Sequence, residues 1–355
     1  MISALMSKTE REEAPMTMVV GFDVHRSQIT YDCLDTETGE VQTGRITPAT
    51  REALREWISR FDGKHLKVAV EATTGWRFCV EELRAAGCEV YLAEAAETRA
   101  LRGRKRRAKT DRADARWLRT LLVREELPTS WIPPTQICEL RTRVRLRQAL
   151  VEERSGWLHR INAVLLHQGT RTEHPLNTER GRSELEELEL SLAGRELVGV
   201  ALEMVRSLDR QIEPVEAELR AYANSQPACK ALQGHFGIGP VIAVAIHAEV
   251  GDARRFSSSR KLVRLSGLDI TVYESADKRQ SGRISRQGAP LLRWALYEAA
   301  QAATRHTSPD RHDYRKLKAR LGHNRASLEI ARRILRRCHH TLVALGDEQL
   351  APAAD

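Results

Sequence analysis

Two aspartates stand three residues apart inside the most basic stretch of this chain. The stretch reads RGRKRRAKTDRADARWLRTLL (residues 102–122), and from Arg99 to Arg119 it holds ten Lys or Arg but only two acids, Asp111 and Asp114. On a helix, positions i and i+3 lie on the same face. The pair therefore either forms salt bridges with neighbouring arginines or binds a cation in a segment that attracts phosphates.

Two further acids belong to apolar, strand-like runs. Asp23 interrupts MVVGFDVH, and Glu71 closes HLKVAVE. A charge inside an apolar strand is costly unless it meets a metal ion or hydrogen-bond partners, and residues at strand ends commonly line sites. Each acid alone also fits a solvated strand end. Taken jointly, the four carboxylates predict a site for Mg²⁺ or Mn²⁺, which prefer oxygen ligands. The set is Asp23, Glu71, Asp111 and Asp114.

The elements that must position these acids follow a simple order. Three strands, a helix, a strand, a helix, a strand and a further helix are predicted over residues 17–125, which indicates an α/β domain. Acids on the first strand, on a later strand and on a closing helix are typical of an RNase H-like nuclease fold. His25, two residues beyond Asp23, is either a neighbour of the metal site or an ordinary polar residue at a strand end.

A proline-rich linker (127–136) precedes a long helical region. The apolar spacing of residues 137–225 predicts a helical arm. Two kinds of packing fit this spacing equally well: packing within the chain, and coiled-coil dimerisation. The second apolar series of the arm is Ala201, Met204, Leu208, Gln211, Val215, Leu219 and Tyr222. Residues 229–345 predict a mainly α-helical C-terminal domain, in which GIGP (237–240) is either a phosphate-binding hairpin or a plain tight turn.

Composition points to nucleic acid as a partner. The 355 residues carry a net charge of +9, and residues 305–340 hold eleven Lys or Arg against three acids. The six cysteines form no CxxC pair, which argues against a zinc ribbon or a disulfide scaffold. The sequence lacks a signal-peptide core and any apolar run of membrane-spanning length. We therefore expect a soluble, cytoplasmic protein with no membrane partner.

Several strings of the sequence resemble a known family. GFDVH, VAVEATTGW and KTDRADAR are similar to the signature segments of the DEDD transposases of bacterial insertion sequences, the IS110 family. LQGHFGIGPVIAVAIHAEVGD and GRISRQGAPLLRWALYEAA resemble that family's second conserved domain. The resemblance implies a RuvC-like N-terminal domain whose metal ligands are the four acids, and an activity of DNA strand cleavage and exchange.

The resemblance also implies a serine nucleophile in the C-terminal domain. Aligning on GRISRQG (282–288) places the family serine at Ser275, with Ala276 where glycine is usual and Ala289 where asparagine is usual. Ser281, which precedes a glycine, is the alternative. Attack by a serine hydroxyl keeps the phosphodiester energy available for rejoining. Basic residues of the same segment are expected to bind phosphates, namely Lys278, Arg279, Arg283 and Arg286.

By the same resemblance, the partners are DNA (element ends and target), a structured guide (bridge) RNA and further copies of the chain in a dimer or tetramer. Nucleic-acid backbones are expected to bind Arg104, Lys105, Arg106, Arg107 and Lys109, with an affinity that falls steeply with salt. Two other functions stay open. One is a RuvC-like, metal-dependent, structure-selective nuclease without serine chemistry, and the other is a non-catalytic nucleic-acid-binding protein.

Overall fold

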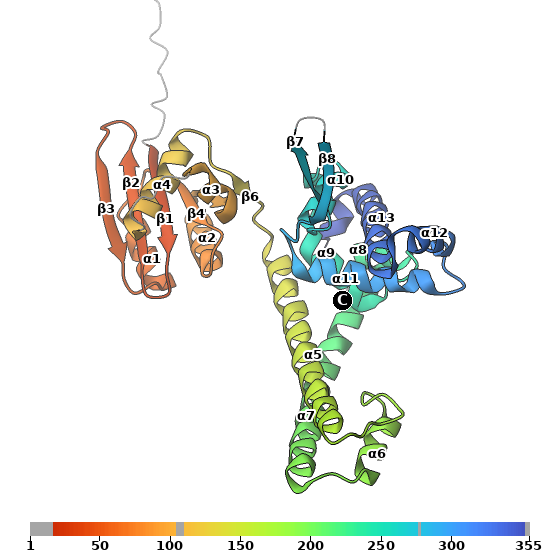
Figure 1. Ribbon diagram of the computed structural model, residues 1–355. Coiled ribbons are helices and arrows are strands. Elements are labelled where there is room, and N and C mark those ends of the chain that lie inside the picture. The colour runs from red at the N-terminus through yellow and green to blue at the C-terminus, as the bar shows by residue number, and fades with distance from the viewer. Residues whose placement is uncertain (1–16, 104–109, 276–277, 352–355) are drawn as a thin grey trace, which may run out of the picture. The chain divides into compact units, whose positions relative to one another are not determined.

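The chain folds as two compact units that divide between Ile132 and Pro133. The computed structural model describes residues 17–103, 110–275 and 278–351 (Figure 1). The first unit is a mixed sheet with helices and the second is mainly helical, so the predicted fold class is confirmed. The predicted arm and the predicted C-terminal domain both fall inside the second unit. Within the described residues, no helix is long and apolar enough to cross a membrane.

A six-stranded sheet forms the centre of the first unit. Its strands are β1 (Thr17–Val24), β2 (Ile29–Asp35), β3 (Val41–Ile46), β4 (His65–Glu71), β5 (Glu89–Ala93) and β6 (Thr129–Ser130). Their order is β3-β2-β1-β4-β5-β6. β1 pairs antiparallel with β2 and parallel with β4, and β4 pairs parallel with β5. The carboxyl ends of β1 and β4 therefore meet at one edge of the sheet.

Helices cover both faces of this sheet. They are α1 (Arg51–Ser59), α2 (Trp76–Ala85), α3 (Ala95–Leu101) and α4 (Asp111–Val123). Successive side chains of a strand point to opposite faces. Phe22 of β1 lies in the apolar core beside α1 and α2, with its ring 5.1 Å from that of Trp57. Gly21 and Asp23 therefore belong to the opposite face, where α4 packs on β1 and β2 (Figure 1).

A buried carboxylate joins α1 to α2. Glu82 accepts hydrogen bonds from Arg55 Nε at 2.5 Å and from Arg51 Nη1 at 2.6 Å. The hydrogen bond from Arg55, and after it the one from Arg51, lowers the pKa of the Glu82 carboxyl from 4.5 to about 2. The folded protein thus binds fewer protons at Glu82 than the unfolded chain does. The stability from this group is complete above pH 4.5 and is lost as the pH falls towards 2.

Glu82→Gln is therefore expected to flatten the acid limb of the stability profile. The wild-type free energy of unfolding should fall between pH 4.5 and pH 2, and the variant should lose part of that slope. Urea unfolding followed by tryptophan fluorescence at a series of pH values measures it. Glu56→Gln is the matched control, since the Glu56 side chain is exposed and its carboxylate lies 3.8 Å from Arg60 in an exposed ion pair. Equal profiles for the two variants would contradict this account of Glu82.

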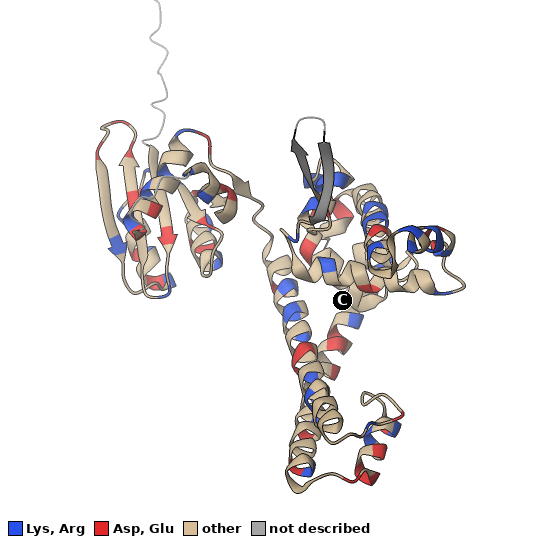
Figure 2. Ribbon diagram, viewed as in Figure 1, with Lys and Arg blue, Asp and Glu red and all other residues tan. Residues whose placement is uncertain are grey.

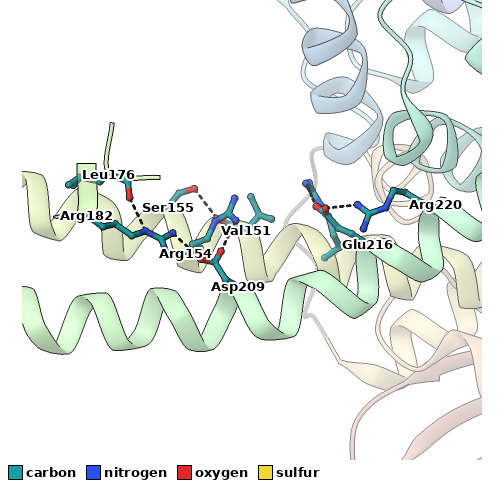
Figure 3. A network of polar contacts seen from close by, with 9 residues as sticks. Val151, Arg154, Ser155, Leu176, Arg182, Asp209, Glu216 and Arg220 are labelled. Carbon is teal, nitrogen blue, oxygen red and sulfur yellow. Dashed lines mark hydrogen bonds and ion pairs between the residues drawn. The ribbon is translucent and has the colours of Figure 1, made fainter. Parts of the chain in front are cut away.

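The second unit begins with two long helices that pack against each other. The elements are α5 (Thr135–His167), α6 (Glu179–Glu187) and α7 (Leu192–Ser225). A polar network crosses the pair: Asp209 of α7 accepts from Arg154 at 2.9 Å and from Arg182 at 3.0 Å (Figure 3). Farther along, Arg147 of α5 contacts Glu216 of α7 at 2.7 Å. The pairing order shows that the helices are antiparallel.

The buried ladder of α7 differs from the predicted apolar series at two positions. Val205 and Ile212 are buried, while Met204 is 39% exposed and Gln211 is exposed. The observed ladder faces the rest of its own chain at alternating spacings of three and four residues, which is the antiparallel packing that the sequence left open. α7 also continues through Pro214. Dimerisation through the arm stays a prediction.

The rest of the second unit is a helical core with one hairpin. Its elements are α8 (Pro227–Gln233), α9 (Pro240–Val250), η1 (Ala253–Arg255), α10 (Ser259–Leu265), β7 (Ile270–Ser275), β8 (Lys278–Ile284), α11 (Pro290–Gln301), η2 (Ala302–Thr304), α12 (Arg311–Leu321), α13 (His323–Ala344) and η3 (Gly346–Leu350). The predicted GIGP turn joins α8 to α9. Gly237 has φ +90°, and a Cβ there would lie 2.5 Å from the Ala299 carbonyl oxygen. Close packing on α11 therefore explains this glycine without a ligand.

Candidate metal centre

The sheet and α4 bring the four predicted acids of the first unit to one cavity. Asp23 is the second-last residue of β1 and Glu71 the last of β4, and the strands pair in parallel up to Phe22 and Val70. Asp111 and Asp114 lie in the first turn of α4. All four line a cavity of about 1220 Å³. The sequence-predicted acids thus share one site, although their role as ligands stays a proposal.

The start of α4 is fixed by the string KTDRAD. Thr110 is the N-cap, and its hydroxyl accepts a hydrogen bond from the Ala113 amide at 3.2 Å. Threonine is a preferred N-cap because it satisfies a free amide of the first turn. Asp111 and Asp114 follow at once, where the positive end of the helix dipole favours anionic side chains. Local sequence therefore places both carboxylates at the helix end that faces the cavity.

A glycine lets α4 lie directly on β1. A Cβ at Gly21 would sit 2.1 Å from the Ala115 carbonyl oxygen and 2.7 Å from the Arg119 amide nitrogen. Both atoms belong to the helix backbone, which cannot rotate away as a side chain can. Gly21 stands two residues before Asp23 on the same face of the strand. The missing side chain therefore sets the distance between Asp23 and the two aspartates of α4.

Gly21→Ala is expected to displace α4 and to lower both the stability and the rate of cleavage. Overpacking costs about 1–3 kcal/mol, whereas moving catalytic groups by about 1 Å lowers rates roughly a hundredfold. Thermal unfolding and a strand-cleavage assay measure the two effects. Gly199→Ala is the control, because a Cβ on that glycine of α7 meets nothing within 4 Å. Full cleavage activity in Gly21→Ala would show that the close approach does not position the site.

A buried ion pair also holds α4 on this face of the sheet. Asp32 of β2 is directly paired with Gly21 of β1 and is 1% exposed. Its carboxylate binds the Arg119 guanidinium, and Arg116 Nε lies 3.4 Å away. Asp32 is not among the sequence-predicted site residues. Its inward position in the alternating run ITYDCLD was the only available signal, because its partners are more than eighty residues away in the chain.

His25 joins two of the acids. Its Nε2 lies 3.2 Å from Asp23 Oδ2 and 3.4 Å from Asp111 Oδ1. One donor atom from each of these three residues lies within 4.8 Å of the other two, a spacing that could hold one metal ion. Gln28 Nε2 donates to Asp111 Oδ2 at 3.1 Å and orients that carboxylate. Of the two interpretations of His25, the geometry favours the neighbour of the site.

The electrostatics of Asp23 fit a cation. The residue is 5% exposed, and its Oδ2 accepts no hydrogen bond from the described part of the chain, although His25 Nε2 lies 3.2 Å away as an ion-pair neighbour. Burial raises the pKa of the Asp23 carboxyl from 3.8 to about 6. His25 opposes this rise in pKa, and the three other acids of the cavity add to it. A buried acceptor surrounded by like charges suits a divalent ion with oxygen ligands.

Arginines stand beside the acids. Arg102 forms an ion pair with Asp114, and its guanidinium carbon lies 6.0 Å from the centre of the Trp117 ring. Arg99 and Arg102 both line the cavity. The predicted basic residues of the neighbouring segment fall outside the described residues, namely Arg104, Lys105, Arg106, Arg107 and Lys109. Arg102 and Gln28, which the prediction of site residues omitted, contact the aspartates of α4 directly.

Ser275 belongs to the second unit. It is the last residue of β7, and its register partner is Lys278, the first residue of β8. The backbone on the two sides of residues 276–277 forms an antiparallel β-hairpin of β7 and β8. Ser281 pairs with Val272 within the ladder, three residues nearer the base of the hairpin by register. The predicted phosphate-binding residues Lys278, Arg279 and Arg283 also lie on β8.

Arg286 lies just beyond the hairpin. It is exposed and has φ +54°, and its backbone amide donates to the Gly267 carbonyl oxygen at 3.1 Å. This contact fixes the chain where it leaves β8 for α11. Arg286 thus lies on the surface of the second unit, and its binding of phosphate stays a prediction.

Comparison with known proteins identifies two conserved regions. Residues 20–168 match the IS110-type DEDD transposase family. Residues 229–316 match the transposase IS116/IS110/IS902 family. A Sinorhizobium fredii protein named "Putative transposase y4rJ" is 30% identical over 348 residues, covering 85% of this chain and 86% of the relative. The transposase for insertion sequence element IS1111A of Coxiella burnetii is 30% identical over 239 residues, 63% of this chain and 64% of the relative.

Proposed function

Since the chain belongs to the IS116/IS110/IS902 transposase family, we propose that it recombines DNA with two chemical devices. The first is a divalent cation, Mg²⁺ or Mn²⁺, held by carboxylates of the first unit. The second is a serine nucleophile, Ser275, in the second unit. Family membership makes the protein a DNA transposase, and the cation, the serine and an RNA guide are the additions of this proposal.

The buried Asp23 carboxylate is the observation that carries the metal site. Its buried Oδ2 has only the ion-pair contact to His25 Nε2 at 3.2 Å and no hydrogen bond within the described residues, and three more acids line the same cavity. Asp23, Glu71 and Asp111 would hold the ion together with Asp114. Bound there, the ion would neutralise charge on a phosphodiester and help to activate the attacking oxygen. Arg99 and Arg102 line the cavity and can orient a phosphate beside the acids.

Serine chemistry balances without an external reagent. The Ser275 Oγ–P bond forms, the P–O bond to one deoxyribose oxygen breaks, and the leaving oxygen takes up the proton that the serine hydroxyl releases. The covalent ester retains the energy needed to join the phosphate to another DNA end. The position of Ser275 at the last residue of β7 supports it over Ser281, which lies inside the ladder.

The partners in this proposal are DNA and RNA. The substrate comprises the element ends and the target, and a structured guide RNA directs pairing. Strand exchange breaks and joins several strands together, so several copies of the chain must act as a dimer or tetramer. The net charge of +9 supports binding to both kinds of nucleic acid.

A cleavage assay on DNA that carries the element ends separates this proposal from its alternatives. Recombination with serine chemistry gives cleavage that requires Mg²⁺ or Mn²⁺, is lost in EDTA and leaves a covalent protein–DNA adduct on a denaturing gel. A RuvC-like nuclease gives metal-dependent cuts without an adduct. A binding protein gives neither. Either of the last two results, obtained with guide RNA present, would overturn the proposal.

A further inference from the structure

A group of cations on α12 and the start of α13 has no role in the metal centre or the serine hairpin. We name it the α12 surface, and its residues are Arg311, Arg315, Lys316, Lys318, Arg320 and Arg325. All of them are exposed except Arg311, which is partly exposed. Figure 2 shows blue positions crowded along α12. The unassigned charge of this surface calls for a partner.

The acids near this surface are already engaged elsewhere. Asp310 accepts from Arg337 of α13 at 2.6 and 3.1 Å, and Asp313 forms an ion pair with Arg333 of α13. They are the only acids between residues 305 and 325. Among the described residues, no carboxylate forms an ion pair with a cation of the α12 surface. The arginines of α13 therefore satisfy the local acids, and the charge of α12 stays uncompensated.

Packing holds α12 in place from its opposite side. Tyr314 and Leu317 are 5% and 9% exposed and belong to the main core of the second unit. The Tyr314 hydroxyl lies 2.7 Å from His323 Nδ1, and Gly322, with φ +80°, makes the turn into α13. The α12 surface therefore belongs to a helix that is packed on the core of the second unit.

The spacing of the cations is unfavourable for a free helix. Arg311 and Arg315 stand at i and i+4, as do Lys316 and Arg320, and like charges at this spacing repel each other. A solvated helix surface usually mixes both signs of charge. Phosphates placed along the helix would relieve the repulsion, and the eleven residues of α12 span about 16 Å.

We propose that the α12 surface binds the sugar–phosphate backbone of double-stranded DNA, independently of base sequence. This rests on the family's function as a DNA transposase, which supplies the partner. Guanidinium groups bind phosphate oxygens in pairs, and lysines add point charges. The contact holds the duplex on the second unit and takes no part in bond breaking.

The test compares two variants of the full-length chain that each lose three charges. One is Arg315→Gln/Lys316→Gln/Lys318→Gln, and the control is Arg143→Gln/Arg206→Gln/Arg210→Gln, which changes exposed arginines of α5 and α7. Binding of a labelled DNA duplex of unrelated sequence is followed by fluorescence anisotropy in EDTA over a series of KCl concentrations. An RNA duplex of the same sequence is measured in parallel.

The α12 variant should bind DNA at least about tenfold more weakly than the wild type. The slope of log K against log salt should also become shallower by about 0.9 for each lost phosphate contact, which is about 3 for the three substitutions. The control should keep the wild-type slope. An unchanged slope, an equal loss in both variants, or a loss confined to RNA would overturn the proposal. Because binding is measured in EDTA, failure of the metal-site proposal would leave this result unaffected, and circular dichroism confirms that both variants fold.

Discussion

Asp23→Asn is expected to abolish strand cleavage in a protein that is at least as stable as the wild type. The side chain keeps its size and loses its charge at a position where the carboxylate is buried among three other acids. Removing a metal ligand forfeits several kcal/mol of transition-state stabilisation, so cleavage should fall roughly a thousandfold. In the metal-free protein the same change removes a buried charge, and the free energy of unfolding should rise by about 1 kcal/mol or more.

Two measurements separate this outcome from simple damage to the fold. Mg²⁺ or Mn²⁺ should raise the melting temperature of the wild type, because a ligand that binds only the folded state stabilises it, and it should not raise that of Asp23→Asn. Asp62→Asn, on an exposed residue of the same unit, should keep both cleavage and the metal response. Retained cleavage in Asp23→Asn contradicts the metal site.

A less buried ligand guards against an ambiguous result. If Asp23→Asn loses stability along with activity, Asp111→Asn repeats the test, since the Asp111 side chain is 40% exposed and tolerates substitution more easily. Cleavage that survives in Asp111→Asn would then speak against the site.

Ser275→Ala is expected to remove the covalent protein–DNA adduct and strand joining together. The hydroxyl oxygen is the atom that bonds to phosphorus in the proposed reaction, so adduct formation should fall by about a thousandfold or more. The adduct is detected on a denaturing gel with labelled DNA. The metal-induced rise in melting temperature should remain, because the acids belong to the first unit and Ser275 to the second.

Ser281→Ala is the matched control for this prediction. It removes the same atom from the same hairpin, at a position inside the β7–β8 ladder. Its adduct should equal that of the wild type. If Ser281→Ala loses the adduct and Ser275→Ala keeps it, the nucleophile is Ser281. If both variants keep it, the serine mechanism is wrong for this chain.

Local sequence patterns predict much of the secondary structure of the first unit. Alternation and apolar runs predict the strands that contain Asp23 and Glu71, and the Thr110 N-cap makes the start of α4 readable from KTDRAD. The period of two residues also places His25 on the face of Asp23, a signal that the sequence analysis left undecided. Such features depend on residues within one helical turn or one strand, so sequence alone can report them.

The arm shows where local pattern fails. A series containing Met204 and a series containing Val205 both approximate a spacing of three and four residues. Only packing on α5 selects Val205 for the interior and leaves Met204 39% exposed. A shift of one residue along a helix turns the buried stripe by about 100°, and the facing helix decides which stripe is favourable. The same limit hid the hairpin, because a strand needs its partner to be recognised.

The sequence by itself determined which acids could form the site, which elements carry them and which family the chain resembles. Tertiary structure decided how the acids come together. Gly21 gives α4 the room to approach, Asp32 binds Arg119 from 87 positions away, and His25 lies between two carboxylates. These contacts join residues that are distant in the chain, and their geometry follows from sheet register and helix packing. Local periodicity does not encode the distances between these residues, so only the folded chain shows how near Asp111 comes to Asp23 and that Asp114 lines the same cavity.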